Sequence, residues 1–341
     1  MSDFKLVTGF EELWRPSARS NRQIRQPALA ASHNGASDNI RARLVRVVRG
    51  APEVIVKVVG RTRNARQLHA HLSYISRGGV LEMEDREGAV LSGRDDLREL
   101  AEDWSATALM DRHARTETPI SRAIVLSAPP GVEATAVREA TRAFARERLA
   151  ERFEYVFVVH TDTAIAHAHL TARHLGRDAC RLNLKKADIP VWRETWAQAL
   201  RDQGIAAEAT SRAARGMTRK PEGSVLRRIA AQHAAGRGEI ARTLASAYQQ
   251  AARAAFLGDT APKPWEAAMV HRQSKVRALY LAQAKLLQAS IRPDDRVLGA
   301  EVEAFVRSMP APDSLRLALA REMRAANETL RSRRRERDDN R

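Results

Sequence analysis

The strongest constraint on the fold is a pair of apolar segments that lie close together in the chain and carry His160, His167 and His169. Residues 153–162, FEYVFVVHTD, and residues 167–175, HAHLTARHL, each have the composition of a buried β-strand. Because the connecting loop is short, a tight antiparallel return would pair the two strands. Side chains alternate along a strand, so this pairing brings His160 and Asp162 beside His167 and His169.

Other segments of the same region alternate between strand and helix patterns. Residues 52–60 and 120–131 are rich in β-branched side chains and predict strands, and residues 81–91 predict a hairpin. Apolar residues at helical spacing predict four helices. The inner face of the first carries Leu68, Leu72 and Ile75, that of the second Leu97, Leu100 and Trp104, that of the third Val137, Ala140 and Phe144, and that of the fourth Ile189, Trp192, Trp196 and Leu200. We therefore expect a mixed α/β domain.

Composition along the chain predicts four parts. Residues 1–50 are rich in Ser, Asn, Ala and Arg and suggest a flexible basic arm, and residues 51–220 hold the α/β domain. Residues 221–330 form a helical region broken by glycines and prolines, and residues 331–341 suggest a disordered basic tail.

Charge and cysteine content narrow the classes of function. The formal net charge is +17, which favours a polyanionic partner. A lone cysteine excludes an intramolecular disulfide, and the sequence lacks a run of 18 apolar residues, so we expect a cytoplasmic protein without membrane insertion. The sequence has no P-loop motif, which disfavours a motor. A two-metal nuclease needs several carboxylates at strand ends, whereas Asp162 alone accompanies the histidine motif and most other acidic residues lie on charged helix faces.

The three histidines predict an open metal site. Neutral imidazoles that converge from adjacent strands can hold a divalent cation and leave coordination positions for water or substrate oxygens. The simpler alternative is accidental clustering, because ten histidines occur in the chain and histidine pairs also line exposed strand faces. The third histidine, the nearby carboxylate and the apolar flanks favour the metal site.

Tyr74 is the candidate nucleophile. It lies on the flank of the helix whose buried face carries Leu68, Leu72 and Ile75. A phenol is a poor nucleophile at its ordinary pKa of about 10, but a nearby cation favours the phenolate. From the residues alone, a tyrosine at the rim of the core is the simpler interpretation.

Three segments resemble the motifs of plasmid relaxases, the mobilisation nucleases of the HUH endonuclease superfamily. Residues 72–79, LSYISRGG, resemble the first motif; residues 124–131, IVLSAPPG, resemble the second; residues 160–169, HTDTAIAHAH, match the third. Residues 176–216 are similar to the region that follows the third motif, so the resemblance covers roughly residues 52–216. The chain departs from the pattern at Ala128, where an aromatic residue is common, and in an alanine-containing loop that replaces Asn-Pro before His167.

The resemblance implies an HUH-type fold, a mainly antiparallel sheet flanked by helices, and a tyrosine that nicks single-stranded DNA at a transfer origin. It implies that His160, His167 and His169 bind Mg²⁺ or Mn²⁺, that Tyr74 attacks the DNA, and that Ser127 is the serine of the second motif. Asp162 would orient an imidazole or take the tyrosine proton. Implied partners are accessory relaxosome proteins and a type IV secretion coupling protein, with transfer to the recipient cell.

Several alternatives remain open at this point. Arg177, Arg181, Lys185 and Lys186 follow the histidine strand and are candidates for DNA backbone contacts, but a charged loop is also simply solvated. The basic tail is either a recruitment signal or a solubilising segment. The rival functions are a rolling-circle replication or transposition nuclease and a non-catalytic basic DNA-binding protein. The position of Tyr74 ahead of the histidines favours a relaxase over the first rival.

Overall fold

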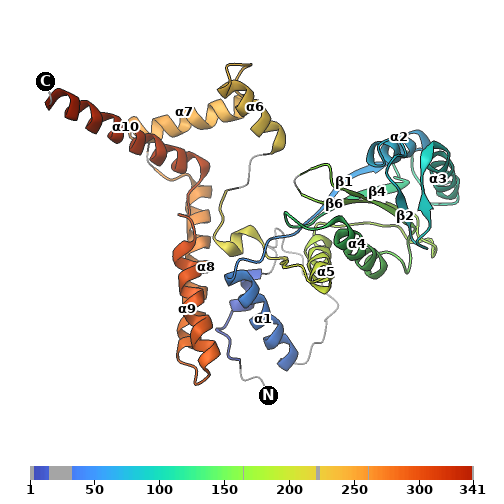
Figure 1. Ribbon diagram of the computed structural model, residues 1–341, viewed down its shortest axis with the longest axis horizontal. Coiled ribbons are helices and arrows are strands. Elements are labelled where there is room, and N and C mark those ends of the chain that lie inside the picture. The colour runs from blue at the N-terminus through green and yellow to red at the C-terminus, as the bar shows by residue number, and fades with distance from the viewer. Residues whose placement is uncertain (1–3, 15–32, 164, 220–222, 260, 340–341) are drawn as a thin grey trace. The chain divides into compact units, whose positions relative to one another are not determined.

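The structure is a computed structural model that describes residues 4–14, 33–163, 165–219, 223–259 and 261–339. The chain divides into two compact units (Figure 1). One unit spans Pro16–Thr210 and holds the sheet, and the other combines Met1–Arg15 with Ser211–Arg341. Each unit is described by itself.

The first unit is built on a six-stranded sheet in the order β1-β4-β6-β5-β2-β3. Its strands are β1 (Ile55–Thr62), β2 (Met83–Asp85), β3 (Val90–Leu91), β4 (Ser121–Ser127), β5 (Tyr155–His160) and β6 (His167–Arg173). All neighbouring strands pair antiparallel, including β5 with β6. The prediction of a mixed fold with a mainly antiparallel sheet is therefore confirmed.

Helices cover the two faces of the sheet to different extents (Figure 1). On one face α4 (Ala134–Arg148) and α5 (Asp188–Asp202) share a core with strands β1, β4, β5 and β6. On the other face α2 (Ala65–Ile75) and α3 (Gly93–Ala108) pack on Met83 of β2 and on Val156 and Val158 of β5. Strand alternation explains the division, because Tyr155 and Phe157 of β5 point to the α4 and α5 side.

Helix α2 has clear local reasons to begin and end where it does. The Asn64 side chain accepts a hydrogen bond from the Gln67 backbone N–H and caps the first turn. Leu68, Leu72 and Ile75 are fully buried, as their spacing predicted. After Ser76 the chain adopts left-handed backbone angles, with φ of 57° at Arg77 and 75° at Gly78, which stops the helix.

Part of the region predicted to be a flexible arm is helical. Helix α1 (His33–Val48) buries Leu44 and Val47 completely. Its Arg43 and Arg46 pair with the fully buried carboxylate of Glu208 at 3.2 and 2.8 Å. The helix is fixed by this distant partner, which local composition does not reveal. Residues 15–32 of the predicted arm lie outside the described residues.

The second unit is helical. It contains η1 (Phe10–Trp14), η2 (Arg212–Arg215), α6 (Ser224–Ala234), α7 (Arg242–Phe256), α8 (Pro264–Gln288), α9 (Pro293–Ser308) and α10 (Leu315–Asp339). Phe10 packs edge-on against Tyr280 of α8 with ring centroids 5.6 Å apart. Residues 331–339, predicted as a disordered tail, continue α10, because arginine and glutamate are good helix formers.

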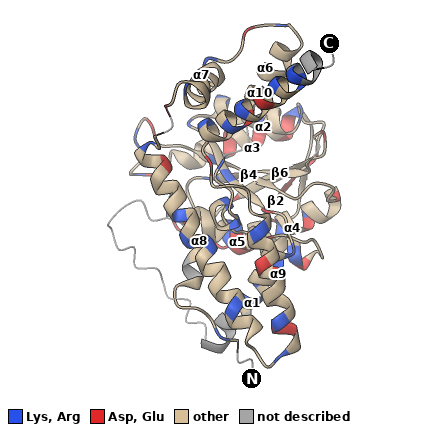
Figure 2. Ribbon diagram, turned by 90° about the vertical axis from the view of Figure 1, so that its left-hand side faces the viewer, with Lys and Arg blue, Asp and Glu red and all other residues tan. Residues whose placement is uncertain are grey.

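Basic side chains are spread over the helices of both units (Figure 2). Among the described residues, every helix is too short or too polar to span a bilayer.

Candidate active site

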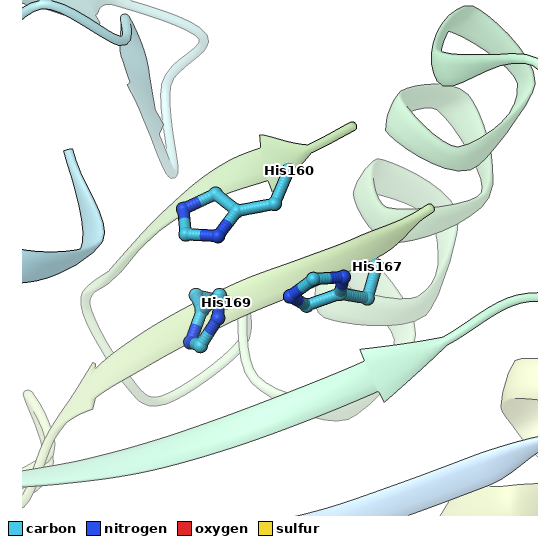
Figure 3. Close-up of side chains that lie close together, drawn as sticks. All are labelled: His160, His167 and His169. Carbon is cyan, nitrogen blue, oxygen red and sulfur yellow. The ribbon is translucent and has the colours of Figure 1, made fainter. Parts of the chain in front are cut away.

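Three histidines converge at the adjoining ends of β5 and β6 (Figure 3). In the antiparallel register His160 lies opposite His167, and Val158 lies opposite His169. One imidazole nitrogen from each ring lies within 4.8 Å of the other two. The sequence prediction that a tight return brings these side chains together agrees with this geometry.

Backbone carbonyls hold two of the rings through one nitrogen each. His160 Nε2 donates to the Ile75 carbonyl at 2.5 Å, and His167 Nδ1 donates to the Ile165 carbonyl at 3.0 Å. These bonds leave the lone pairs of His160 Nδ1 and His167 Nε2 for other partners, and His160 Nδ1 accepts from the Arg77 guanidinium at 3.4 Å. Metal-binding histidines are commonly oriented in this way, with the second ring nitrogen bonded to a carbonyl or carboxylate.

Burial keeps His160 and His169 in the form that can bind a cation. It lowers the pKa of His160, and it lowers the pKa of His169 to about 4, with a smaller contribution from the neighbouring His160. Both rings are therefore neutral at pH 7. Ligand nitrogens about 2.1 Å from an ion lie about 3.4 Å from one another in tetrahedral geometry, so small ring rotations suffice for all three to reach one ion. The residues present fit a divalent metal.

Tyr74 lies in the last turn of α2, next to the residue whose carbonyl contacts the cluster. Its side chain is 68% exposed, while Ile75 beside it is fully buried and bonds to His160 through its carbonyl. The backbone therefore places an accessible phenol one residue away from a histidine contact. An exposed phenol at this point can meet a substrate without displacing the core.

Arg77 connects this helix end to the histidine cluster, and the sequence analysis did not single it out. Its guanidinium pairs with the Asp162 carboxylate, lies 3.4 Å from His160 Nδ1, and donates to the Tyr74 carbonyl at 3.2 Å. The same group lies 5.7 Å from the centre of the Tyr74 ring. The only sequence signal is its place three residues after Tyr74, in the segment Ser76-Arg77-Gly78-Gly79.

Asp162 is held in its charged form. The hydrogen bond from Arg77 is the largest cause that lowers its pKa, and its side chain is 52% exposed. The carboxylate is thus ionised at neutral pH and accessible to solvent. Asp162 contacts Arg77, and the Arg77 guanidinium contacts the His160 ring. Asp162 therefore acts on His160 through Arg77.

Comparison with known proteins bears on this arrangement. Residues 74–205 match the family model of the MobA/VirD2-like relaxase nuclease domain. This segment is similar to a relaxase nuclease domain. It begins at Tyr74 and includes all three clustered histidines.

Curated proteins are similar to about half of the chain. T-DNA border endonuclease VirD2 of Rhizobium radiobacter is 28% identical over 187 residues, which cover 50% of this chain and 44% of that protein. VirD2 of Agrobacterium fabrum (strain C58 / ATCC 33970) is 27% identical over 187 residues, covering 50% and 42%, respectively. The chain therefore spans less than half the length of these relatives.

Ser127 lies beside the cluster, within the segment that matches the family model. It ends β4 directly opposite His167, and its carbonyl accepts a hydrogen bond from the Trp196 indole at 3.0 Å. The backbone of the second motif is therefore anchored to the core of α5. The half-buried serine side chain shares the face of the sheet that carries the histidines.

The structure places the predicted basic residues after β6 elsewhere. They follow the end of β6 opposite to His167, and a strand of this length separates its ends by roughly 20 Å. Arg177 pairs with Glu154 at 2.7 Å, and Arg181 pairs with Asp111 at 2.7 Å. Lys185 and Lys186 are exposed. Arg177 and Arg181 are therefore not brought to the histidine cluster.

A fourth histidine near the cluster was also missed. His71 Nε2 lies 2.9 Å from the Thr171 hydroxyl of β6, and burial lowers the pKa of His71. The residue lies one helical turn before Tyr74 and on the sheet side of α2. His71 lies three residues before Tyr74 and four before Ile75, a spacing that puts all three on neighbouring parts of one helix surface. This spacing is the sequence signal that could have identified His71.

Proposed function

We propose that this protein nicks and rejoins single-stranded DNA at a plasmid transfer origin, with Tyr74 as the nucleophile. The observation that carries the proposal is the bond between the Ile75 carbonyl and His160, which joins the tyrosine's helix turn to the histidine cluster. The relaxase family match over residues 74–205 supports the reaction class. The high positive charge supports a nucleic-acid substrate.

The metal centre of the proposal consists of His160, His167 and His169. A divalent ion held there, Mg²⁺ or Mn²⁺, would supply positive charge to stabilise the phosphate oxygens. His160 and His169 contribute neutral rings because burial lowers their pKa values. The carbonyls of Ile75 and Ile165 keep two of the rings oriented.

In the proposed reaction the Tyr74 hydroxyl oxygen attacks the scissile phosphorus in line with the 3′ oxygen that leaves. The new bond is a 5′-phosphotyrosyl ester, and the bond to the 3′ oxygen breaks to give a free 3′-hydroxyl. The phenol loses a proton and the departing oxygen gains one. Asp162 is a candidate acceptor because Arg77 keeps it ionised. One phosphodiester replaces another, so the reverse reaction rejoins the strand.

The wider setting of the proposal is conjugative mobilisation. The nicked strand would leave the cell attached to Tyr74, aided by accessory relaxosome proteins and a type IV secretion coupling protein. The protein would act in the cytoplasm before this transfer. The helical unit, with its basic α10, is the part of the chain available for such partners.

Cleavage of labelled single-stranded DNA from the protein's own mobilisation region tests the proposal. Wild type with Mn²⁺ should give a covalent protein–DNA band and a shortened strand on a denaturing gel, and EDTA should abolish both. Tyr74→Phe should bind the strand but form no band. Cleavage without an adduct would indicate a hydrolytic nuclease, and binding with no cleavage would indicate a DNA-binding module.

A further inference from the structure

Two arginines face each other at the ends of β1 and β4 that are remote from the histidine cluster. Arg61 of β1 lies directly opposite Arg122 of β4 in the antiparallel register. Their Cβ atoms are therefore about 5 Å apart, a spacing at which like charges on neighbouring strands destabilise a sheet. Arg122 lies five residues before Ser127, which lies opposite His167, so about 17 Å of strand separates the arginine pair from the cluster.

The arginine pair also lies on the other face of the sheet. Val125 of β4 pairs with His169 and points to the face that carries the histidines. Side chains alternate along β4, so Arg122 and Ile124 point to the opposite face, where Ile124 packs in the core under α4 and α5. The arginine pair is therefore not part of the histidine site.

The charge of the arginine pair is not compensated by acidic side chains. Among the residues that the structure describes, neither Arg61 nor Arg122 pairs with a carboxylate. Arg122 is half-buried, and its Nε atom is buried without a hydrogen-bond partner. Burial, followed by the charge of Arg61, lowers the pKa of Arg122, but a guanidinium stays protonated in proteins. A half-buried cation without a counter-ion is unfavourable, so an anion bound at this position would stabilise the protein.

The His174 ring lies beside Arg122. The backbone N–H of His174 donates to the carbonyl of Ile120, two residues before Arg122. The residue is 5% exposed, and its Nδ1 atom has no hydrogen-bond partner in the described part of the chain. Burial, followed by the charges of Arg122 and Arg181, lowers the pKa of His174 to about 4, so the ring is neutral at pH 7. A neutral ring can donate a hydrogen bond to an anion without adding to the positive charge.

The charge of this group of side chains suits a phosphate. Asp111 pairs with Arg181 at 2.7 Å and neutralises it, so Arg61 and Arg122 keep two uncompensated positive charges. A phosphate monoester carries about 1.5 to 2 negative charges at pH 7 and three acceptor oxygens, and the planar fork of an arginine binds such oxygens in pairs. A single carboxylate has one charge and two oxygens, so it would compensate only one of the two arginines.

We infer that Arg61 and Arg122, with the His174 ring beside them, form a phosphate-binding site on the sheet face opposite to the histidine cluster. Both guanidinium groups donate to the phosphate oxygens. The ligand has about two negative charges, supplied either by free phosphate or by neighbouring phosphodiesters of a nucleic acid. The inference uses neither Tyr74 nor the clustered histidines, so it can fail or succeed separately from the proposed function.

Thermal unfolding in matched salts tests the inference. Sodium phosphate and sodium chloride are compared at equal ionic strength with EDTA present, which removes any metal that could hold phosphate at the histidine cluster. The rise of the unfolding temperature with phosphate concentration gives a dissociation constant. Arg61→Gln and Arg122→Gln should each raise this constant about 10-fold, because each removes charge-assisted hydrogen bonds. Phosphate also stabilises proteins through exclusion from their surface, so the difference between wild type and variant is the informative quantity.

Matched variants make the result specific. Arg98→Gln removes an exposed cation from α3 and should respond to phosphate like wild type. Arg122→Lys keeps the charge but lacks the fork, so it should recover only part of the affinity. Arg61 is exposed, and Arg61→Gln in chloride should be at least as stable as wild type because the substitution removes the repulsion. Equal phosphate responses in wild type, Arg61→Gln and Arg122→Gln would overturn the inference.

Binding to duplex DNA of unrelated sequence separates the two sources of phosphate. If nucleic acid supplies the ligand, Arg122→Gln should also reduce the slope of log K against log salt by about 0.9. If free phosphate is the ligand, the variant should lose the phosphate response and keep the wild-type slope. A smaller slope with an unchanged phosphate response would mean that Arg122 acts only through its charge, and this result would overturn the site. A failed test of Tyr74 would alter none of these outcomes.

Discussion

Arg77 holds the Asp162 carboxylate beside the helix turn that presents Tyr74. Its guanidinium pairs with Asp162 and also donates to the Tyr74 carbonyl at 3.2 Å. Arg77 adopts a left-handed backbone conformation, with φ of 57°, which residues with a side chain rarely adopt. The contacts with Tyr74 and Asp162 compensate for this unfavourable conformation and join segments 85 residues apart.

Removal of Arg77 should slow the reaction and shift its pH dependence. Arg77 lowers the pKa of Asp162, so Arg77→Ala should raise that pKa toward its ordinary value. If Asp162 acts as an ionised acceptor, the acid limb of the pH–rate profile moves to higher pH, and the rate falls about 10- to 100-fold. Rates of adduct formation between about pH 4 and pH 8 measure both effects. A uniform rate loss with an unmoved acid limb would contradict the role of the ion pair.

Removal of a clustered histidine should weaken metal binding. Loss of a residue that only supports a metal ligand lowers metal affinity roughly 10- to 100-fold. His160→Ala and His169→Ala each remove a direct ligand, so each should reduce Mn²⁺ affinity by at least this factor. Isothermal titration calorimetry gives the affinity. His113→Ala, at an exposed position outside the cluster, is the control and should bind Mn²⁺ like wild type. Equal affinity in all variants would show that the metal binds elsewhere.

Buried histidines should make the metal-free protein less stable in acid. Burial is the main cause that lowers the pKa of His169 and of His174 to about 4, whereas both groups in the unfolded chain protonate near pH 6.5. Between these values the unfolded chain binds more protons, so lowering the pH favours unfolding. The free energy of unfolding in urea with EDTA should fall between about pH 6.5 and pH 4. His174→Asn should show a shallower fall, and an identical pH dependence would contradict this assignment.

Glu208 should anchor α1 to the rest of the sheet-containing unit. Its carboxylate is fully buried and pairs with Arg43 and Arg46, so Glu208→Ala leaves both arginines without this partner. We expect a loss of about 2 kcal/mol in the free energy of unfolding, because hydrogen bonds to charged groups contribute on that scale. Hydrogen exchange should show lower protection in residues 39–48. The control Glu151→Ala, at an exposed position, should change neither quantity.

Local patterns predicted most of what places the histidines. The apolar composition of residues 153–162 and 167–175 predicted both strands, and the short connection between them predicted their antiparallel pairing. The register that sets His160 opposite His167 was not predicted and comes from the structure. Helical spacing likewise identified the buried face of α2 and left Tyr74 on its exposed flank.

Features that depend on distant contacts could not be predicted in this way. The place of Arg77 follows from a left-handed turn and from Asp162, far away in the chain. Helix α1 has little apolar periodicity, and its stability depends on Glu208, which lies more than 160 residues away from Arg43 and Arg46. The ion pairs that place Arg177 and Arg181 away from the cluster also form with residues remote in sequence. Such partners are fixed by tertiary packing, which composition and spacing do not encode.

Mass spectrometry of the covalent protein–DNA adduct tests the central claim most directly. After cleavage of the strand, digestion with nuclease and trypsin should leave a nucleotide on the peptide Gln67–Arg77, whose sequence QLHAHLSYISR contains one of the four tyrosines of the chain. Fragmentation should place the added phosphate on Tyr74. A nucleotide found on a different peptide, or on Ser73 or Ser76 of this one, would contradict the account.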